Sequence, residues 1–189
     1  MKFTALLVVL LLSCLNAFAG TLSGTVKATR QSAVVLETVP AKAFPAPTQT
    51  AAMNQQGMKF MPALLVIQQG TTVVFSNDDN VPHNVFWPSI SGNKKLSHNV
   101  GTFNKGKTLN FKYENAGNVP LLCNIHSEMV GTIVVSPSPY FAETDAAGNY
   151  TIKDVPDGTY KATAWDNGKA TTVPVTVKGD TKLDFAPAK

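Results

Sequence analysis

Short runs in which apolar and polar residues alternate recur along the chain, separated by clusters rich in glycine, proline, asparagine and aspartate. Thr108–Tyr113 is the clearest run, with Leu109, Phe111 and Tyr113 on one face. Alternation with a period of two predicts half-buried β-strands. The expected fold class is therefore all-β, built from packed sandwiches. Further strands are predicted over residues 21–28, 33–39, 62–68, 71–75, 83–87, 119–123, 130–135 and, past a turn at 145–149, in the C-terminal segment.

The turn signals between these runs suggest how the chain is divided. Residues 53–136 are expected to form one sandwich, in which Ser89–Gly101 is loop-like. Residues 137–189 form a second, short unit with too little core to stand alone. Residues 20–52, two strands followed by an Ala-, Pro- and Thr-rich linker, are expected to complete it. The central domain would then be inserted between two pieces of one sandwich.

The N-terminus has the three parts of a secretory signal. Met1-Lys2 supplies a positive charge, Leu6–Leu12 is an apolar run, and Ala17-Phe18-Ala19 fits the A-x-A cleavage pattern. We expect residues 1–19 to be removed, leaving no transmembrane span in the mature chain. Two alternatives stay open: retention of the segment as a membrane anchor, and lipid attachment at Cys14, which follows an imperfect lipobox.

Cysteine usage and charge narrow the function classes. The chain has two cysteines, and after the expected cleavage Cys123 stands alone, so it has no partner for an internal disulfide. A lone thiol in an oxidising compartment is a liability unless it is buried or bound. The formal net charge is +4 with scattered lysines, which argues against nucleic-acid binding. A mildly basic surface would instead attract an acidic protein partner.

Four residues are candidate metal ligands. Cys123, His126 and Met129 follow one another at spacings of three, and His83 lies upstream at the end of a polar loop. A thiolate, two imidazoles and a thioether are the donors of a blue-copper site, in which the methionine forms a long axial bond. Each residue alone would be an ordinary core or surface residue. All four in one exported β protein predict a single copper ion.

Rival chemistries need other residues. A zinc site rarely takes methionine, and no carboxylate is placed as a general base, since Glu128 reads as a surface charge. No nucleophile signature surrounds Cys123, so a thiol hydrolase is not favoured. We therefore expect a protein that is not an enzyme. His98 is interpreted as a loop residue, and core or loop placement is preferred over a Cu(I) entry site for three further methionines, Met53, Met58 and Met61.

The central segment resembles the cupredoxins. The run Gly70–Asp78 followed by Pro82-His83-Asn84-Val85 is similar to their first ligand region, and the compact Cys-His-Met loop is similar to that of amicyanin. Ser127 departs from the proline of amicyanin-type loops. The resemblance implies a Greek-key cupredoxin sandwich holding one type 1 copper ion.

The same resemblance assigns roles to individual residues. Cys123 would be the thiolate ligand, His83 the buried imidazole, His126 the imidazole with an exposed edge for electron passage, and Met129 the axial ligand. Asn84 would brace the ligand loop by hydrogen bonding. An apolar docking patch around His126 would consist of Val81, Ile125 and Val130.

The C-terminal motif from Asp145 to Tyr160, D-x-x-G-x-Y-x-I-x-x-V-P-x-G-x-Y, resembles the carboxypeptidase regulatory-like (transthyretin-like) sandwich. The combination resembles bacterial periplasmic cupredoxins grouped with methylamine-utilisation proteins. It implies a periplasmic electron carrier whose partner is a redox protein such as a c-type cytochrome or a periplasmic oxidoreductase. Copper storage or delivery is the alternative, and a docking module with an incidental metal is a third hypothesis.

Overall fold

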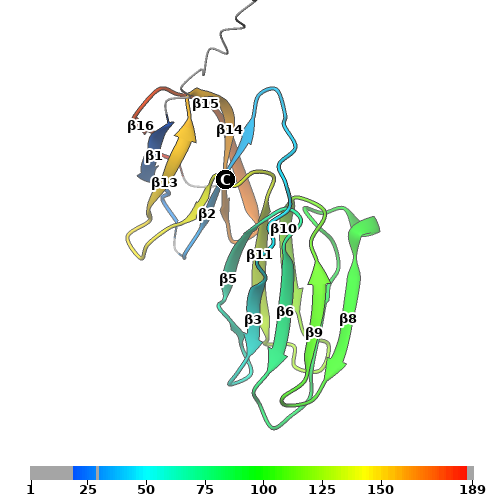
Figure 1. The fold of residues 1–189 in the computed structure, drawn as a ribbon. Coiled ribbons are helices and arrows are strands. Elements are labelled where there is room, and N and C mark those ends of the chain that lie inside the picture. The colour runs from blue at the N-terminus through cyan, green and yellow to red at the C-terminus, as the bar shows by residue number, and fades with distance from the viewer. Residues whose placement is uncertain (1–18, 29, 187–189) are drawn as a thin grey trace, which may run out of the picture.

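The computed structural model describes residues 19–28 and 30–186, which form sixteen strands and one 3-10 turn, η1 (Lys94–Leu96). The strands build two sandwiches that lie one above the other in Figure 1. We call them the terminal unit and the central unit. The predicted all-β class is confirmed.

The terminal unit combines strands from both ends of the chain. In one sheet, β1 (Ala19–Thr25) pairs with both β13 (Asn149–Pro156) and β16 (Thr181–Lys182). The other sheet has the order β12 (Phe141–Glu143), β2 (Ala33–Thr38), β14 (Gly158–Asp166), β15 (Lys169–Val177). The core between the sheets consists of Leu22, Val26, Val34, Leu36, Tyr150, Ile152, Val155, Tyr160, Ala162, Ala164, Val177 and Phe185.

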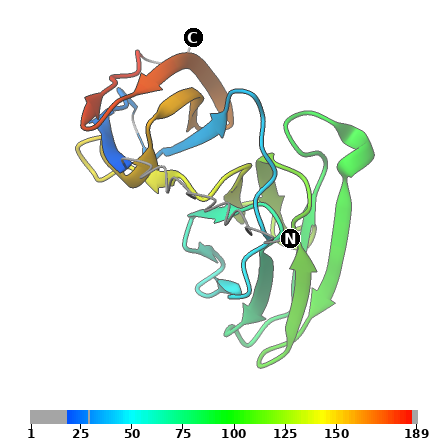
Figure 2. The same cartoon turned by 45° about the horizontal axis from the view of Figure 1, so that its top comes forward.

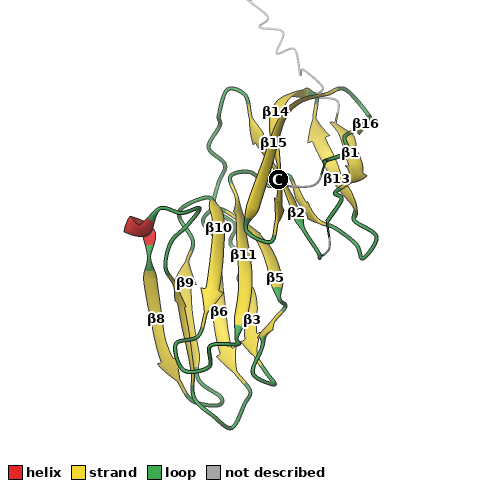
Figure 3. Ribbon diagram, turned by 180° about the vertical axis from the view of Figure 1, so that it is seen from behind, coloured by secondary structure: helices red, strands yellow, loops and turns green. Residues whose placement is uncertain are grey.

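The central unit occupies the intervening chain. Its larger sheet has the order β5 (Leu64–Gln68), β11 (Val130–Ser136), β10 (Gly117–Leu122), β7 (His83–Trp87), β8 (His98–Phe103). The facing sheet has the order β4 (Phe60–Met61), β3 (Ala51–Gln55), β6 (Thr72–Asn77), β9 (Thr108–Lys112). Figure 3 shows the two layers from behind. Buried aromatic and aliphatic side chains fill the space between them, among them Phe75, Trp87, Tyr113 and Ile133.

The two units meet at a small apolar junction. Ala33 and Val35 of β2 pack with Leu64, Val66 and Val134 of the central unit, and Phe141 and Trp165 cover them. Residues 39–50 lead from β2 down to β3, as the light-blue segment of Figure 2 shows. Glu143 adds a polar link, because its carboxylate accepts a hydrogen bond of 3.3 Å from the backbone N–H of Val66.

Two local predictions were wrong. Residues 89–101 were expected to be a loop, yet they hold η1 and most of β8, which pairs antiparallel with β7. β8 is an edge strand with exposed residues on both faces, so it lacks the alternation by which strands are recognised. β3 begins at Ala51, inside the predicted linker, and is held by parallel pairing with β6.

Most of the predicted signal sequence lies outside the described residues, as does Cys14; within it, only Ala19 is described, and it begins β1. Within residues 19–28 and 30–186, no helix has the length and apolar character needed to cross a bilayer.

Candidate metal centre

The four predicted ligand residues lie on two segments that the larger sheet of the central unit brings together. His83 is the first residue of β7, whereas Cys123, His126 and Met129 lie in the connection from β10 to β11. β10 runs between β7 and β11, pairing with both of them. The connection therefore curls over the start of β7, and residues 40 positions apart become neighbours.

Three donor atoms converge on one point. The nearest ligand atoms of His83, Cys123 and His126 all lie within 4.8 Å of one another. The two Nδ1 atoms of the histidines are 3.1 Å apart, and their rings meet edge to face. His83 is fully buried and Cys123 is 4% exposed, while His126 is half-buried. The site is thus closed to solvent on the His83 side and open at His126.

Met129 is buried in the same apolar cluster as Cys123 and is 1% exposed. Its backbone N–H donates a hydrogen bond of 3.1 Å to the carbonyl oxygen of His126, which closes a tight turn in the loop. That the Met129 thioether is a fourth copper ligand stays a prediction.

Asp79 orients the buried imidazole, a role that the sequence analysis did not assign. Its Oδ2 lies 2.8 Å from Nε2 of His83 and also accepts from the backbone N–H of Met58, while Oδ1 accepts from Gly57. Hydrogen bonds from Met58 and His83 lower the pKa of Asp79 to about 2. An ionised carboxylate at Nε2 holds the proton there and leaves Nδ1 as a lone-pair donor. The spacing of Asp79 four residues before His83 was the available signal.

Asn84 contacts the thiol through its backbone. Its N–H donates to Sγ of Cys123 at 3.4 Å, and its carbonyl accepts from Nε2 of Gln55 at 3.2 Å. The side-chain amide donates to Asn99 and Thr102 on β8. The expected brace on the ligand loop therefore comes from the main chain of Asn84, whereas its side chain ties β7 to the edge strand.

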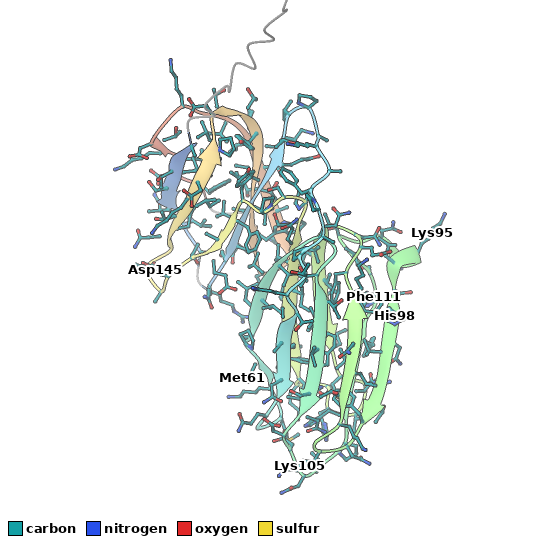
Figure 4. The ribbon with its side chains drawn as sticks, viewed as in Figure 1. Met61, Lys95, His98, Lys105, Phe111 and Asp145 are labelled. Atoms are coloured by element: carbon teal, nitrogen blue, oxygen red, sulfur yellow. The ribbon has the colours of Figure 1, made fainter. Side chains whose placement is uncertain are left out.

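Among the described residues, His98 is not part of the donor cluster of His83, Cys123 and His126. His98 is exposed at the start of β8, where its ring packs on Trp87 and Phe111 (Figure 4). Met53 is buried in the core, while Met58 and Met61 are 38% and 50% exposed.

The three residues of the predicted docking patch are large exposed apolar side chains. Val81, Ile125 and Val130 are 42%, 45% and 58% exposed. Val81 precedes the first ligand residue by two positions, and Ile125 and Val130 lie next to ligand-loop residues. Lys105 lies at the lower end of the central unit in Figure 4 and donates a hydrogen bond of 3.0 Å to Asn80, the residue before Val81.

The comparisons with known proteins concern the two units separately. Residues 47–136, just under half of the chain, match the model of a family described as copper binding proteins, plastocyanin/azurin family. Residues 133–183 match the model described as polysaccharide lyase family 4, domain II.

Several solved structures are similar to the chain. A purple cupredoxin from Nitrosopumilus maritimus is 29% identical, with 46% of this chain and 99% of that one covered and a TM-score of 0.41. Amicyanin from Paracoccus versutus is 22% identical, with 48% and 85% covered and a TM-score of 0.42. An amicyanin mutant in the Cu(I) state is 20% identical, with 55% and 98% covered and a TM-score of 0.43.

The residues fit a copper ion. Two imidazole nitrogens and one thiol that converge within 4.8 Å are the donors that copper selects, and no carboxylate competes within this cluster. The donor cluster and the family match together indicate one copper ion, held by the central unit. The matched family comprises electron-transfer proteins, not enzymes.

Proposed function

We propose that this chain is an exported, periplasmic blue-copper protein that carries single electrons between redox partners. The observation that carries the proposal is the convergence of His83, Cys123 and His126 in a largely buried cluster whose loop also buries Met129. A copper ion bound there would supply one-electron chemistry, with the cysteine thiolate, the two imidazoles and the methionine thioether as its ligands.

The surrounding residues support rapid electron exchange. The network of Asp79, Asn84 and Gln55 holds the donors before metal arrives, so little rearrangement accompanies a change of oxidation state. The buried His83 keeps water from one side, while the half-buried His126 offers an edge to a partner. Electrons would therefore enter and leave through His126.

The surface that would contact a partner is inferred from the exposed side chains around His126. Val81, Ile125 and Val130 give an apolar contact, and Lys105 adds positive charge at the same end. Exposed apolar side chains near a lysine suit an acidic redox protein such as a c-type cytochrome or a periplasmic oxidoreductase. We also propose that the terminal unit is the carboxypeptidase regulatory-like sandwich that its sequence resembles, serving as a spacer or docking element.

The test is the optical and EPR spectrum of the mature protein loaded with Cu(II). We expect an intense blue thiolate-to-copper band that Cys123→Ser abolishes and Met129→Leu shifts without abolishing. Pale, ordinary copper spectra in the unmodified protein would rule out a cysteine ligand and the carrier function with it.

A second measurement distinguishes an electron carrier from a protein that stores or delivers copper. A carrier retains copper, because a buried four-donor site releases it slowly, and it exchanges electrons with a reduced c-type cytochrome in stopped-flow mixing. Rapid loss of copper to a mild chelator, with slow electron exchange, would favour delivery instead.

A further inference from the structure

A cleft of about 490 Å³ lies where the terminal unit overhangs the larger sheet of the central unit. Its wall on the central side comes from β10 and β11, where Pro120 pairs with Thr132 and Leu122 pairs with Val130. Neighbouring side chains along a strand point to opposite faces, and Val119, Leu121 and Ile133 fill the core. The cleft therefore lies on the outer face of this sheet.

The opposite wall comes from the terminal unit. The hairpin of β14 and β15 supplies Trp165, Asn167 and Gly168, and the segment before β2 supplies Arg30 and Gln31. Figure 3 shows this hairpin meeting the ends of β10 and β11. Trp165 is half-buried, so one part of its indole packs in the junction and the rest borders the cleft. Both units are needed to form the site.

Two features of the lining point to a ligand. Asn118 is 7% exposed, yet its Oδ1 has no hydrogen-bond partner, which is uncommon for a buried polar atom. Arg30 is the only charged residue among the described residues that line the cleft. The remaining lining is mostly apolar, as in small-molecule sites at domain interfaces.

We propose that this cleft binds a flat aromatic molecule carrying one anionic group, such as an aromatic carboxylate. The ring lies between the Trp165 indole and the apolar wall of Pro120 and Leu122, where aromatic stacking and burial stabilise it. Arg30 pairs with the anion. The unpartnered Oδ1 of Asn118 accepts a hydrogen bond from a donor on the ring, such as a hydroxyl group.

The cleft also borders the proposed metal loop. Leu122 directly precedes Cys123, and Val130 directly follows Met129. An occupant that contacts Leu122 and Val130 is therefore one residue from two proposed ligands, and it changes the environment of the copper without touching it. This consequence rests on the proposed function, whereas the binding itself does not.

The experiment is an NMR titration of the isotope-labelled full chain with 6-hydroxy-2-naphthoate, whose hydroxyl is the required donor, first metal-free and then loaded with Cu(I). We expect the indole N–H resonance of Trp165 and the side-chain amide of Asn118 to shift. Trp87 is the internal control, because its indole donates to the carbonyl of Leu96 inside the central unit. The metal-free arm separates failure of this proposal from failure of the copper proposal.

Two variants assign the contacts. Trp165→Leu is expected to weaken binding about tenfold, since stacking is lost while the site stays apolar. Arg30→Gln is expected to weaken 6-hydroxy-2-naphthoate binding about threefold and leave the binding of the neutral 6-hydroxy-2-naphthamide unchanged. Lys153→Gln removes the same charge from an exposed position that does not line the cleft, and it serves as the matched control.

Three results would overturn the proposal. The first is no shift at Trp165 up to about 1 mM probe, the limit of weak binding. The second is a set of shifts centred on Ile125 and Val81, which would mean adsorption to the exposed apolar patch. The third is movement of Trp165 with protein concentration alone, which would mean that a second copy covers the cleft.

Discussion

Each unit has an aspartate just after a strand, and the two carboxylates hydrogen-bond to different kinds of partner. In the terminal unit, Asp145 accepts hydrogen bonds from Ala147 and Asn149 of its own turn, and Asn149 lowers the pKa of its carboxyl. In the central unit, Asp79 accepts from Gly57 and Met58 of another hairpin and from the ring of a proposed ligand. The first carboxylate closes a turn, whereas the second connects three segments around a donor cluster.

The same contrast holds for whole units. Both bury an apolar cluster between two sheets. Within the part of the chain that the structure describes, converging histidine and cysteine donors occur only in the central unit. Similar architecture therefore supports a metal site in one unit and not in the other, because the loops at the sheet ends carry the donors.

Copper should stabilise the two units unequally, and this is the largest effect expected. A ligand that binds only the folded state contributes about 4 kcal/mol when its free concentration is a thousand times Kd. Hydrogen exchange of β10 amides should slow accordingly on copper addition, and that of β13 amides should change far less. Cys123→Ser should remove most of the slowing. Equal slowing in both strands would mean that the units unfold as one.

A core truncation in the terminal unit should leave the metal site intact. Leu36 is fully buried in β2, and Leu36→Ala is expected to cost about 3 kcal/mol through lost burial and a residual cavity. Urea denaturation measures the loss, and the Cu(II) spectrum should stay unchanged. The exposed Thr176→Ala is the control, with less than about 0.5 kcal/mol expected. An altered spectrum in Leu36→Ala would show that the units are coupled.

Removing the charge of Asp79 should weaken the copper site moderately. Asp79→Asn keeps the side-chain shape but no longer holds the proton on Nε2 of His83, so copper affinity should fall about tenfold. Chelator competition measures this change. Asp78→Asn is the matched control, because Asp78 bonds Asn54 and not the histidine. Equal losses in both variants would make the effect a general one of loop charge.

The smallest effect concerns the junction between the units. Burial raises the pKa of Glu143, opposed by the hydrogen bond from Val66. An acid with a raised pKa in the folded state favours folding at low pH, and this contribution is lost as pH rises through that pKa. As pH rises, the unmodified chain should therefore lose stability relative to Glu143→Gln. The loss should be less than about 1 kcal/mol, since solvent screens the carboxylate. Thermal unfolding between about pH 4 and pH 8 tests the sign.

Local pattern predicted much of the fold but not its edges. Alternation identified β9 over nearly the predicted residues, since one face of the strand is half-buried and the other is exposed to solvent. The same criterion missed β8, which has exposed residues on both faces. It also missed the start of β3, whose partner residues in β6 lie 22 positions away. Edge strands form through pairing with a neighbour, and no window of local sequence contains that neighbour.

By itself the sequence determined the all-β class and singled out the candidate donor residues, because alternation and side-chain chemistry can be read position by position. Only the tertiary structure decided that Nδ1 of His83 faces Nδ1 of His126, that Asp79 holds the other ring nitrogen, and that a cleft opens under Trp165. The histidine contact depends on strand register and the cleft on packing between the units, and both join residues far apart in the chain. The Asp79 contact spans only four residues, but the carboxylate is held in place by Gly57 and Met58, which lie more than twenty positions away.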